Sequence, residues 1–258
     1  MIELREVTKE YSKGVAALNG INLKIEQGEF VFIVGDSGSG KSTLIKLIMK
    51  ELEPTSGTII VNGNNLSRMK HRRVPMYRRN IGVVFQDFRL LKDRNIYENI
   101  AFAQRVTETS TRIIKKKVPA ALSLVGLAQK YKAFPKELSG GEQQRVAIAR
   151  AFAMKPKLLI ADEPIASLDV TTQAQMVRLF RHLQREHDCA ILFIAHDLSM
   201  VRLLCDRVGV MKDGKLVEIG ETEQVFEHPQ HLYTKKLLEA IPIPEISGEE
   251  QSDEETMA

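Results

Sequence analysis

The sequence has little cysteine, no tryptophan and no long apolar run. Its two cysteines, Cys189 and Cys205, stand in apolar surroundings, which excludes a disulfide framework and a cysteine metal site and indicates a reducing compartment. No apolar stretch approaches the ~20 residues that a membrane-spanning helix needs. The first residues, "MIELREVTKEY", are charged from the third position on, unlike a secretory signal peptide. We therefore expect a cytoplasmic protein that reaches a membrane only through a partner.

A strong charge of one sign is also missing. The 37 Lys and Arg residues against 33 Asp and Glu give a formal charge of +4, which is too mild to indicate a nucleic-acid partner. Basic residues do gather at 68–79 ("RMKHRRVPMYRR") and at 115–117 ("KKK"). These runs are either a solvated face or a surface that faces anionic lipid headgroups or the cytoplasmic loops of a membrane protein.

What the sequence does have is a set of short, continuous apolar runs. They are "FVFIV" (30–34), "IGVVF" (81–85), "KLLIA" (157–161) and "CAILFIA" (189–195). Such runs are typical of strands buried on both faces, and helical stretches such as 170–186 separate the later ones. Strands that alternate with helices predict an α/β fold with a mostly parallel sheet. At 258 residues, the chain is long enough for one large domain with a subdomain.

The segments outside this pattern indicate how the chain is divided. Two β-like runs occupy the first 25 residues, and a hairpin is expected around Asp213-Gly214. Between 86 and 138, helices follow one another without strands. We therefore predict an α/β core with an N-terminal β subdomain at 1–85 and 155–240, and a helical subdomain at 86–154. The acidic tail at 241–258 is expected to be disordered.

One loop has the composition of a phosphate site. "GDSGSGKS" (35–42) fits the pattern G-x-x-x-x-G-K-[ST], after a predicted strand and before "KSTLIKLIMKEL" (41–52), which reads as a helix. Glycines let successive backbone N–H groups point at phosphate oxygens, and the helix adds its positive end. Lys41 supplies charge for the β- and γ-phosphates, and the Ser42 hydroxyl can bind Mg²⁺. The loop predicts a nucleoside-triphosphatase site formed by Gly35, Ser37, Gly38, Ser39, Gly40, Lys41, Ser42 and Thr43.

Two acids follow the apolar strand "LLIADEP" (158–164). Asp162 and Glu163 would stand at the carboxyl edge of the sheet, where ligands of such folds bind. Asp162 is expected to hold the Mg²⁺ shell. Glu163 is expected to accept a proton from the attacking water.

A second glycine turn, "LSGGEQ" (138–143), also leads into a helix. With Ser139 as N-cap, its first amides would form another anion receptor, although a capped helix alone explains the pattern equally well. The turn has no lysine, which suits a phosphate that another group already holds. The simplest such group is a second copy of the chain.

With these motifs in this order, the chain resembles the ATP-binding cassette (ABC) ATPases over nearly its whole length. "GDSGSGKST" matches the family's phosphate loop, "LSGGEQ" its signature motif and "LLIADE" its magnesium and catalytic-acid strand. The resemblance implies the ABC ATPase fold, with an N-terminal antiparallel β subdomain and a helical insertion. It also implies Mg²⁺-dependent hydrolysis of ATP.

The same resemblance assigns roles to four further residues. Gln86 in "VVFQD" matches a glutamine that senses the γ-phosphate and contacts Mg²⁺, and His196 in "FIAHD" matches the catalytic switch histidine. Asp169 in "ASLDV" matches the dimer-contacting loop, and Tyr11 matches the aromatic residue that stacks on adenine. In the family, two cassettes meet head to tail around two ATP molecules. The resemblance therefore implies a homodimer in which one chain's turn, Ser139, Gly140, Gly141 and Glu142, serves the partner's ATP.

The two halves of the chain resemble different members of this family. Residues 1 to about 155 are similar to FtsE, the cell-division ATPase that works with the membrane protein FtsX, as in "FPKELSGGEQQRVAIARA". From about 163 the chain is similar to ATPases of oligopeptide and dipeptide importers, as in "HPQHLYTKKLLEAIP". This division suggests a natural divergent cassette or an engineered chimera. We expect an FtsX-like partner, with a peptide permease as the alternative, at the inner face of the cell membrane.

Other classes fit less well. DNA-repair ABC ATPases carry coiled-coil or zinc-bearing insertions that the length and two cysteines do not allow. Translation-type ABC proteins carry two cassettes, and this chain has one phosphate loop. An ATP-gated clamp that turns over too slowly to act as a pump remains a non-enzymatic alternative.

Overall fold

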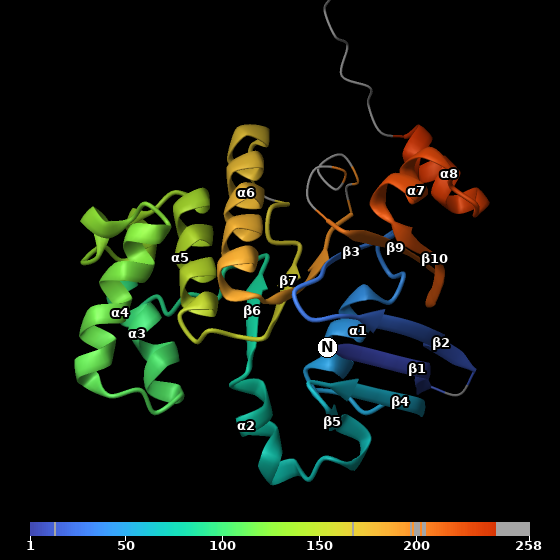
Figure 1. Cartoon of the computed structure of the whole chain (residues 1–258), viewed down its shortest axis with the longest axis horizontal. Helices are drawn as coiled ribbons and strands as arrows, with labels where there is room; N and C mark the ends of the chain where they lie inside the picture. Colours follow the sequence, from blue (N-terminus) through green and yellow to red (C-terminus); the bar gives the residue numbers. More distant parts are fainter. Residues whose placement is uncertain (13, 167, 197, 199–201, 203–204, 241–258) are drawn as a thin grey trace, which may run out of the picture.

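The computed structural model describes residues 1–12, 14–166, 168–196, 198, 202 and 205–240. A first, antiparallel sheet has the strand order β2-β1-β4-β5 (Figure 1). Its strands are β1 (Ile2–Ser12), β2 (Val15–Ile25), β4 (Ser56–Val61) and β5 (Asn64–Asn65). The predicted N-terminal antiparallel β subdomain is therefore confirmed. The tail at 241–258, predicted to be disordered, lies outside the described residues.

The second sheet carries the motifs and has the strand order β10-β9-β3-β8-β7-β6. Strands β9, β3, β8, β7 and β6 run parallel to one another, and β10 pairs antiparallel with β9 through the predicted Asp213-Gly214 hairpin. Both turn residues have positive φ, 48° and 75°, as a tight two-residue hairpin requires. The strands are β3 (Phe30–Val34), β6 (Ile81–Phe85), β7 (Leu158–Asp162), β8 (Ala190–Ile194), β9 (Arg207–Lys212) and β10 (Lys215–Glu221).

The parallel strands are buried on both faces, as their continuous apolar runs predict. Along β3, Phe30 and Phe32 pack into one core, and Val31 and Ile33 pack into the other. The aromatic rings of Phe32 and Phe193 stack across β3 and β8, with centroids 4.9 Å apart. This two-sided burial confirms the α/β fold with a mostly parallel sheet.

Helices cover both faces of this sheet. Helix α1 (Lys41–Ile48) packs between the two sheets, and α5 (Gly140–Phe152) and α6 (Val170–His187) cover the other face. Helix α1 is shorter than the predicted 41–52. Lys50 takes a left-handed φ of 57°, and the Glu51 N–H donates to the carbonyl of Lys46 at 2.8 Å, which closes the helix end.

A third apolar core lies within the helical insertion. It is formed mainly by α3 (Ile96–Val106), α4 (Thr111–Leu124) and the outer face of α5. The buried Asn99 side chain fastens the loop before α3, because its Oδ1 accepts from Leu91 N–H at 2.8 Å and its Nδ2 donates to the Leu91 carbonyl at 3.1 Å. Among the described helices, none combines the length and the apolar composition needed to cross a membrane.

The sequence did not predict the elements between 56 and 80. Strand β4 pairs with β1, for example Ile60 with Glu3, and the chain then forms η1 (Leu66–Arg68), η2 (His71–Arg73) and α2 (Val74–Arg78). Near the C-terminus, α7 (Thr222–Glu227) and α8 (Leu232–Glu239) follow β10. Short 3₁₀ turns, η3 (Ala128–Lys130) and η4 (Pro135–Glu137), precede α5.

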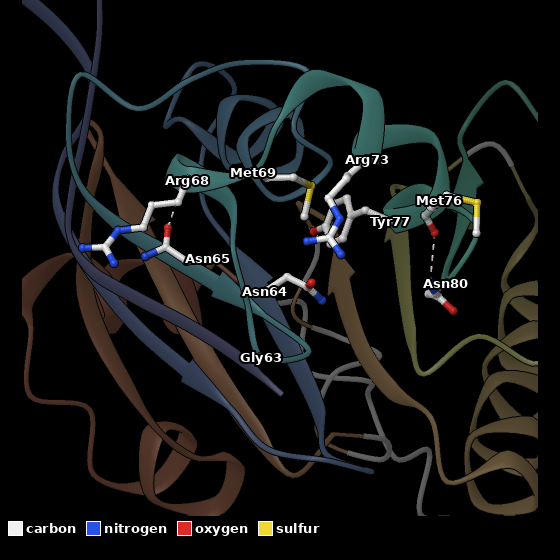
Figure 2. A pocket seen from close by; sticks show the side chains of 9 residues that line it. All are labelled: Gly63, Asn64, Asn65, Arg68, Met69, Arg73, Met76, Tyr77 and Asn80. Atoms are coloured by element: carbon white, nitrogen blue, oxygen red, sulfur yellow. Dashed lines mark hydrogen bonds between the residues drawn. The ribbon is translucent and has the colours of Figure 1, made fainter.

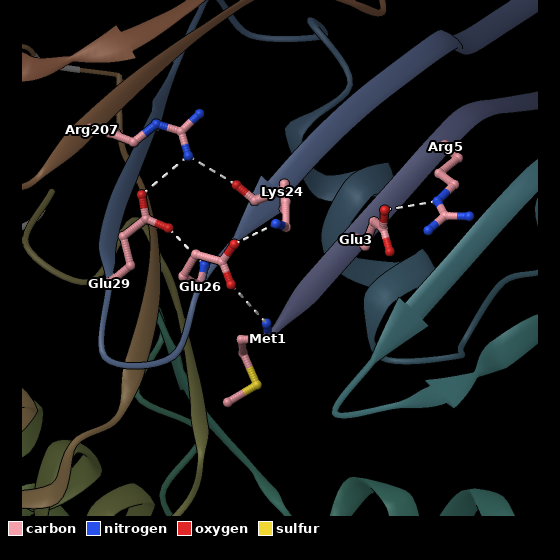
Figure 3. A network of polar contacts seen from close by, with 7 residues as sticks. All are labelled: Met1, Glu3, Arg5, Lys24, Glu26, Glu29 and Arg207. Atoms are coloured by element: carbon pink, nitrogen blue, oxygen red, sulfur yellow. Dashed lines mark hydrogen bonds and ion pairs between the residues drawn. The ribbon is translucent and has the colours of Figure 1, made fainter.

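An ionic cluster joins the two sheets near the N-terminus (Figure 3). Arg207, at the start of β9, contacts the Glu29 carboxylate at 3.1 Å and donates to the Lys24 carbonyl of β2 at 3.0 Å. Glu26 contacts the Lys24 ammonium at 2.6 Å and the Met1 amino group at 3.9 Å. Exposed pairs such as Lys24–Glu26 stabilise little, whereas Arg207 joins the two sheets directly through the Lys24 carbonyl.

Both cysteines are buried thiols, as their apolar surroundings predict. Burial raises the pKa of Cys189 to about 12 and that of Cys205 to about 11. Thiols with such raised pKa values are poor nucleophiles and poor metal ligands. They pack in the core on the α5 and α6 side of the sheet.

Candidate nucleotide site

The loop from Gly35 to Gly40 joins β3 to α1 and requires glycine by its geometry. Gly35, Gly38 and Gly40 have φ of 152°, 82° and 106°. A Cβ on Gly35 would stand 2.1 Å from the Met211 carbonyl oxygen, and one on Gly40 would stand 2.6 Å from the Ala17 carbonyl oxygen. The loop is therefore a close-packed cradle that any side chain at these two positions would fill.

The Lys41 ammonium lies inside this cradle. Its Nζ donates to the carbonyl oxygens of Gly35 and Asp36, at 2.5 and 2.8 Å, and the side chain is buried. Burial lowers the pKa of Lys41, while the carboxylates of Glu163, Asp36 and Asp162 favour its charged form. The loop thus holds a concentrated positive charge next to the two acids that end β7.

These two acids have different surroundings. Burial, and then the neighbouring Glu163 carboxylate, raise the pKa of Asp162. Glu163 has a left-handed φ of 46°, and its N–H donates to the Ile194 carbonyl at 2.8 Å. A non-glycine residue in this conformation is strained, and such strain gathers at functional sites.

His196 lies beside Glu163 at the end of β8. Its Nδ1 is 3.6 Å from Glu163 Oε2, which is an ionic contact if the imidazole is protonated and too long for a hydrogen bond. The imidazole is mostly exposed, with 60% of its side-chain surface accessible, whereas the Glu163 carboxylate is 27% accessible.

Gln86 follows β6, the neighbour of β7. The register pairs Phe85 with Asp162, so Gln86 and Glu163 leave adjacent strands at the same level. Four neighbouring strands, β3, β8, β7 and β6, therefore deliver the phosphate loop, His196, Glu163 and Gln86 to one carboxyl edge of the sheet. This is the edge at which open α/β sheets bind ligands.

Tyr11 reaches the same region from the other sheet. Its hydroxyl is 3.2 Å from Thr43 Oγ1 on the first turn of α1, and 59% of the residue is exposed. The ring thus stands open beside the phosphate loop, where the resemblance expected an aromatic residue.

Two residues that contact this region, Arg150 and Tyr233, were not predicted from the sequence. Phe88 and Arg89, just after Gln86, both have left-handed φ, 57° and 44°. The Arg150 guanidinium of α5 donates to their carbonyl oxygens, at 2.9 and 2.6 Å, and fixes this turn. Tyr233 of α8 accepts from the Asp36 N–H at 3.1 Å. No local pattern in the sequence marked Arg150 or Tyr233 for these contacts.

The second turn, before α5, has the predicted cap. Ser139 Oγ accepts from the Glu142 N–H at 3.3 Å, and Glu142 Oε2 accepts from the Ser139 N–H at 3.0 Å. Lys130 contacts the Glu142 carboxylate at 2.5 Å, and this hydrogen bond lowers the pKa of Glu142. The predicted helix cap is therefore confirmed.

This turn opens into a pocket of its own, of about 300 Å³. Asp169, the N-cap of α6, lies in the same pocket and accepts hydrogen bonds from the backbone and hydroxyl of Thr172, both at 2.8 Å. The pocket is lined by Ser139, Gly140, Gly141, Glu142, Arg145, Leu168, Asp169 and Thr172. None of these residues belongs to the phosphate loop, so the structure gathers the predicted site residues into two separate places.

The residues at the first place fit a nucleoside triphosphate and Mg²⁺. The glycine cradle and Lys41 present backbone N–H groups and a cation, which suit phosphate oxygens. Ser42, Asp162 and Gln86 offer hydroxyl, carboxylate and amide oxygens, the hard ligands that Mg²⁺ prefers.

Comparison with known proteins agrees with this geometry. The family described as ABC transporter matches residues 18–166, and the family described as Oligopeptide/dipeptide transporter, C-terminal region, matches residues 217–256. The first match covers more than half of the chain. This chain therefore belongs to the ABC transporter ATPases, binds ATP with Mg²⁺ and is an ATPase, as the sequence predicted.

Curated relatives of the chain include methionine import ATP-binding proteins. The chain is 41% identical over 242 residues to the methionine import ATP-binding protein MetN of Helicobacter hepaticus, covering 94% of this chain and 69% of that protein. It is 42% identical over 241 residues to MetN of Photobacterium profundum, covering 92% and 70%.

Solved structures show the same fold. A dimeric ATP-binding cassette in a post-hydrolysis state, bound to ADP and phosphate, has a TM-score of 0.78 at 33% identity, covering 86% of this chain and 99% of that one. The protein cbiO1 from Clostridium perfringens, part of an ABC transporter complex, has a TM-score of 0.82 at 34% identity, covering 88% and 90%. The predicted ABC ATPase fold is confirmed.

The comparisons change one expectation. The alignments with MetN proteins run through 92–94% of the chain, across the boundary near 155–163 where the sequence suggested a division between two ancestries. A continuous relationship at about 41% identity gives no support to a chimera or to an FtsE-like half. The match at 217–256 agrees with the predicted likeness to oligopeptide and dipeptide importers at this end.

Proposed function

We propose that this chain is the ATP-hydrolysing subunit of an ABC importer for methionine or a closely similar amino acid. The observation that carries the proposal is the likeness to the methionine import ATP-binding proteins, 41% identical over 94% of the chain. An importer replaces the cell-division role that the sequence favoured, and it corresponds to the sequence's alternative of an import system.

In the proposed site, ATP is held by the cradle at 35–43 and by the Tyr11 ring. Backbone N–H groups of Ser37, Gly38, Ser39 and Gly40, the Lys41 ammonium and the hydroxyls of Ser42 and Thr43 meet the phosphates. Tyr11 stacks on the base, which its open position beside Thr43 allows. Ser42, Gln86 and Asp162 would hold the Mg²⁺, which would supply positive charge next to the phosphates.

The proton of the attacking water is taken by Glu163. The Glu163 carboxylate stands at the carboxyl edge of β7, beside Lys41 and next to the His196 imidazole at 3.6 Å. His196 orients this carboxylate and contacts the γ-phosphate, and Gln86 positions the water. Glu163 leaves β7 in a left-handed turn, and its carboxylate favours the charged form of Lys41 in the cradle.

The second turn completes the site of another copy. Ser139, Gly140, Gly141 and Glu142 present helix amides to an open pocket that contains no phosphate-loop residue. A homodimer arranged head to tail brings this turn to the partner's ATP, and Asp169 lies at the same interface. The γ-phosphate then joins the two chains, and its hydrolysis releases them.

The membrane partner of this proposal is the permease of the import system. The chain lies at the inner face of the cell membrane through that permease, and nucleic acid has no part in the mechanism. Import of oligopeptides or dipeptides is a second candidate, favoured by the match of residues 217–256 to the C-terminal region of such transporters.

The test is capture of the partner by tagged Glu163→Gln protein from detergent-solubilised membranes with Mg-ATP. Loss of the general base is expected to lower kcat about 10²- to 10⁴-fold and to retain the ATP-bound dimer on its permease. Glu186→Gln, an exposed acid far along α6, is the matched control and should hydrolyse ATP at the wild-type rate.

The captured permease is then reconstituted and tested for uptake. Saturable, ATP-dependent uptake of methionine supports the proposal. Uptake of peptides alone supports the second candidate, and co-purification of an FtsX-like protein contradicts both.

A further inference from the structure

An open pocket beside α2 has no part in the nucleotide site. It has a volume of about 450 Å³ (Figure 2). Figure 2 shows Arg68 and Asn65 at one end, Met76 and Asn80 at the other, and Arg73 between them. Its lining contains no carboxylate and consists of Gly63, Asn64, Asn65, Arg68, Met69, Arg73, Met76, Tyr77 and Asn80.

The segment that forms this pocket carries basic residues without acidic ones. Residues 54–86 contain no Asp or Glu. The same segment contains Arg68, Lys70, Arg72, Arg73, Arg78 and Arg79. With six cations and no acid, this segment alone has a net charge of +6.

The cations of this segment divide into two groups. Arg78 donates to the carbonyls of Met49 and Lys50, at 3.0 and 3.1 Å, and Arg79 contacts the Glu108 carboxylate at 3.0 Å. These two residues fix α2 to its surroundings. Across the described part of the chain, no acidic side chain pairs with the four remaining cations, Arg68, Lys70, Arg72 and Arg73, all of which are exposed.

The pocket suits a compact anion with several oxygen atoms. A guanidinium such as that of Arg73 can donate two parallel hydrogen bonds to a phosphate. Asn80 adds an amide with one remaining donor, because its Nδ2 also donates to the Met76 carbonyl at 3.0 Å. Met76 stands at the rim with 58% of its surface exposed. Cations beside an exposed apolar side chain are typical of surfaces that bind the headgroup region of a membrane.

The position of the pocket agrees with this ligand. The Arg79–Glu108 ion pair ties α2 to the turn between α3 and α4. Figure 1 shows α2 and this turn on one side of the molecule and α7 and α8 on the opposite side. The pocket therefore shares a face with the turn between α3 and α4 of the helical insertion.

We propose that this pocket binds the phosphate of an anionic phospholipid headgroup. The proposal rests on the proposed function, because the permease is what holds the chain next to a membrane. A contact at this pocket orients the cassette against the bilayer.

The test uses the full chain and floating vesicles of phosphatidylcholine with or without roughly one third phosphatidylglycerol. Each unpaired cation is expected to contribute about five-fold to binding, so the double variant Arg68→Gln, Arg73→Gln should bind anionic vesicles on the order of 25-fold more weakly. Lys115→Gln, Lys116→Gln removes the same charge from the exposed face of α4 and should bind almost as the wild type does. Both double variants should retain ATPase activity.

Three results would overturn the proposal. Equal losses of vesicle binding in the two double variants would show that general charge attraction, and not a specific site, holds the protein on the vesicles. Release from vesicles by glycerol 3-phosphate, at the concentration of the headgroups, would show a site for a soluble phosphate ester. Loss of permease capture by the pocket variant, with vesicle binding intact, would show that an acidic permease loop is the ligand.

Vesicle binding is measured without the permease and without transport, so the two proposals can fail separately. If uptake and capture fail while the pocket variant still loses vesicle binding, only the import function is wrong. If import is established while vesicle binding does not depend on Arg68 and Arg73, only the lipid site is wrong.

Discussion

The two glycine turns that face anions, at 35–42 and at 138–142, differ in how the chain surrounds them. In the first, Lys41 and Ser39 are buried, and Gly35 and Gly40 lie against backbone atoms of other segments. In the second, Ser139 and Gly140 are exposed, and a Cβ on Gly140 would meet nothing closer than 3.7 Å. The first turn is enclosed by its own chain, and the second is open.

This difference indicates which turn needs another molecule to complete its binding site. An enclosed cradle with its own cation can hold a triphosphate within one chain. An open turn with helix amides, a capping serine and no lysine gains a complete ligand shell only when a second surface covers it. The solved cassette at 33% identity is dimeric and is bound to ADP and phosphate.

The largest expected effect comes from filling the enclosed turn. Gly35→Ala places a Cβ 2.1 Å from the Met211 carbonyl oxygen, a backbone atom that cannot easily move. We expect the free energy of unfolding to fall by about 3 kcal/mol and ATP binding to be lost. Urea unfolding and nucleotide titration measure the two effects.

Gly38→Ala is the matched control for this change. Its Cβ would meet nothing within 4 Å, so only its φ of 82° opposes the substitution, at a cost of about 1 kcal/mol. Equal losses at Gly35 and Gly38 would show that the cradle is not close-packed.

A smaller effect is expected at the contact between α5, the helix that follows the open turn, and the loop after Gln86. Arg150→Met removes both hydrogen bonds to the carbonyls of Phe88 and Arg89, which should lower the free energy of unfolding by about 2 kcal/mol. Amide hydrogen exchange of residues 86–90 should become faster. Arg150→Lys retains the charge but cannot donate to both carbonyls, so it should lose only about half as much free energy of unfolding. Unchanged hydrogen exchange in Arg150→Met would show that Arg150 does not fix the loop after Gln86.

The smallest effect concerns the acid beside the enclosed turn. Burial and Glu163 raise the pKa of Asp162, so its contribution to stability is present below the ordinary aspartate pKa and is lost as the pH rises through the raised value. Asp162→Asn should therefore have a slightly higher melting temperature than the wild type at neutral pH and the same melting temperature at acid pH. The same variant should lose Mg²⁺-dependent hydrolysis. Asp93→Asn, an exposed acid, should leave both unchanged. A lower melting temperature for Asp162→Asn at neutral pH would contradict this explanation.

The sequence predicted the parts of the fold that depend on local patterns. The strands "FVFIV" and "IGVVF" appear with the predicted bounds, because continuous apolar residues leave few other places for these segments. The segment at 56–80 was not predicted. Its main strand, β4, is determined by pairing with β1, more than 50 residues earlier in the chain, and no local pattern marks that pairing.

The site residues also divide into those that a local pattern predicted and those that it did not. The spacing of Gly35, Gly40 and Lys41 and the acids after β7 were sufficient to predict a phosphate and metal site. Tyr11 came only from the family resemblance, since its approach to Thr43 depends on how the two sheets pack. The clamp of Arg150 on the turn after Gln86 joins residues 61 and 62 positions apart, which only the folded chain brings together.

We propose that the open turn serves the ATP of the partner chain. Mixing two inactive variants is the most direct test of this arrangement. Lys41→Met disables the phosphate loop. Gly140→Asp places a negative charge at the open turn, where there is room for the side chain. Each variant alone should be inactive, and the ATPase rate of an equimolar mixture is compared with that of the wild type.

Half of randomly formed dimers in this mixture contain one chain of each kind. In a head-to-tail dimer, the intact phosphate loop of one chain then meets the intact turn of the other, so each mixed dimer holds one complete site. The ATPase rate of the mixture should therefore recover to roughly a quarter of the wild-type rate. A mixture as inactive as its components would show that each turn serves its own chain and would contradict the account.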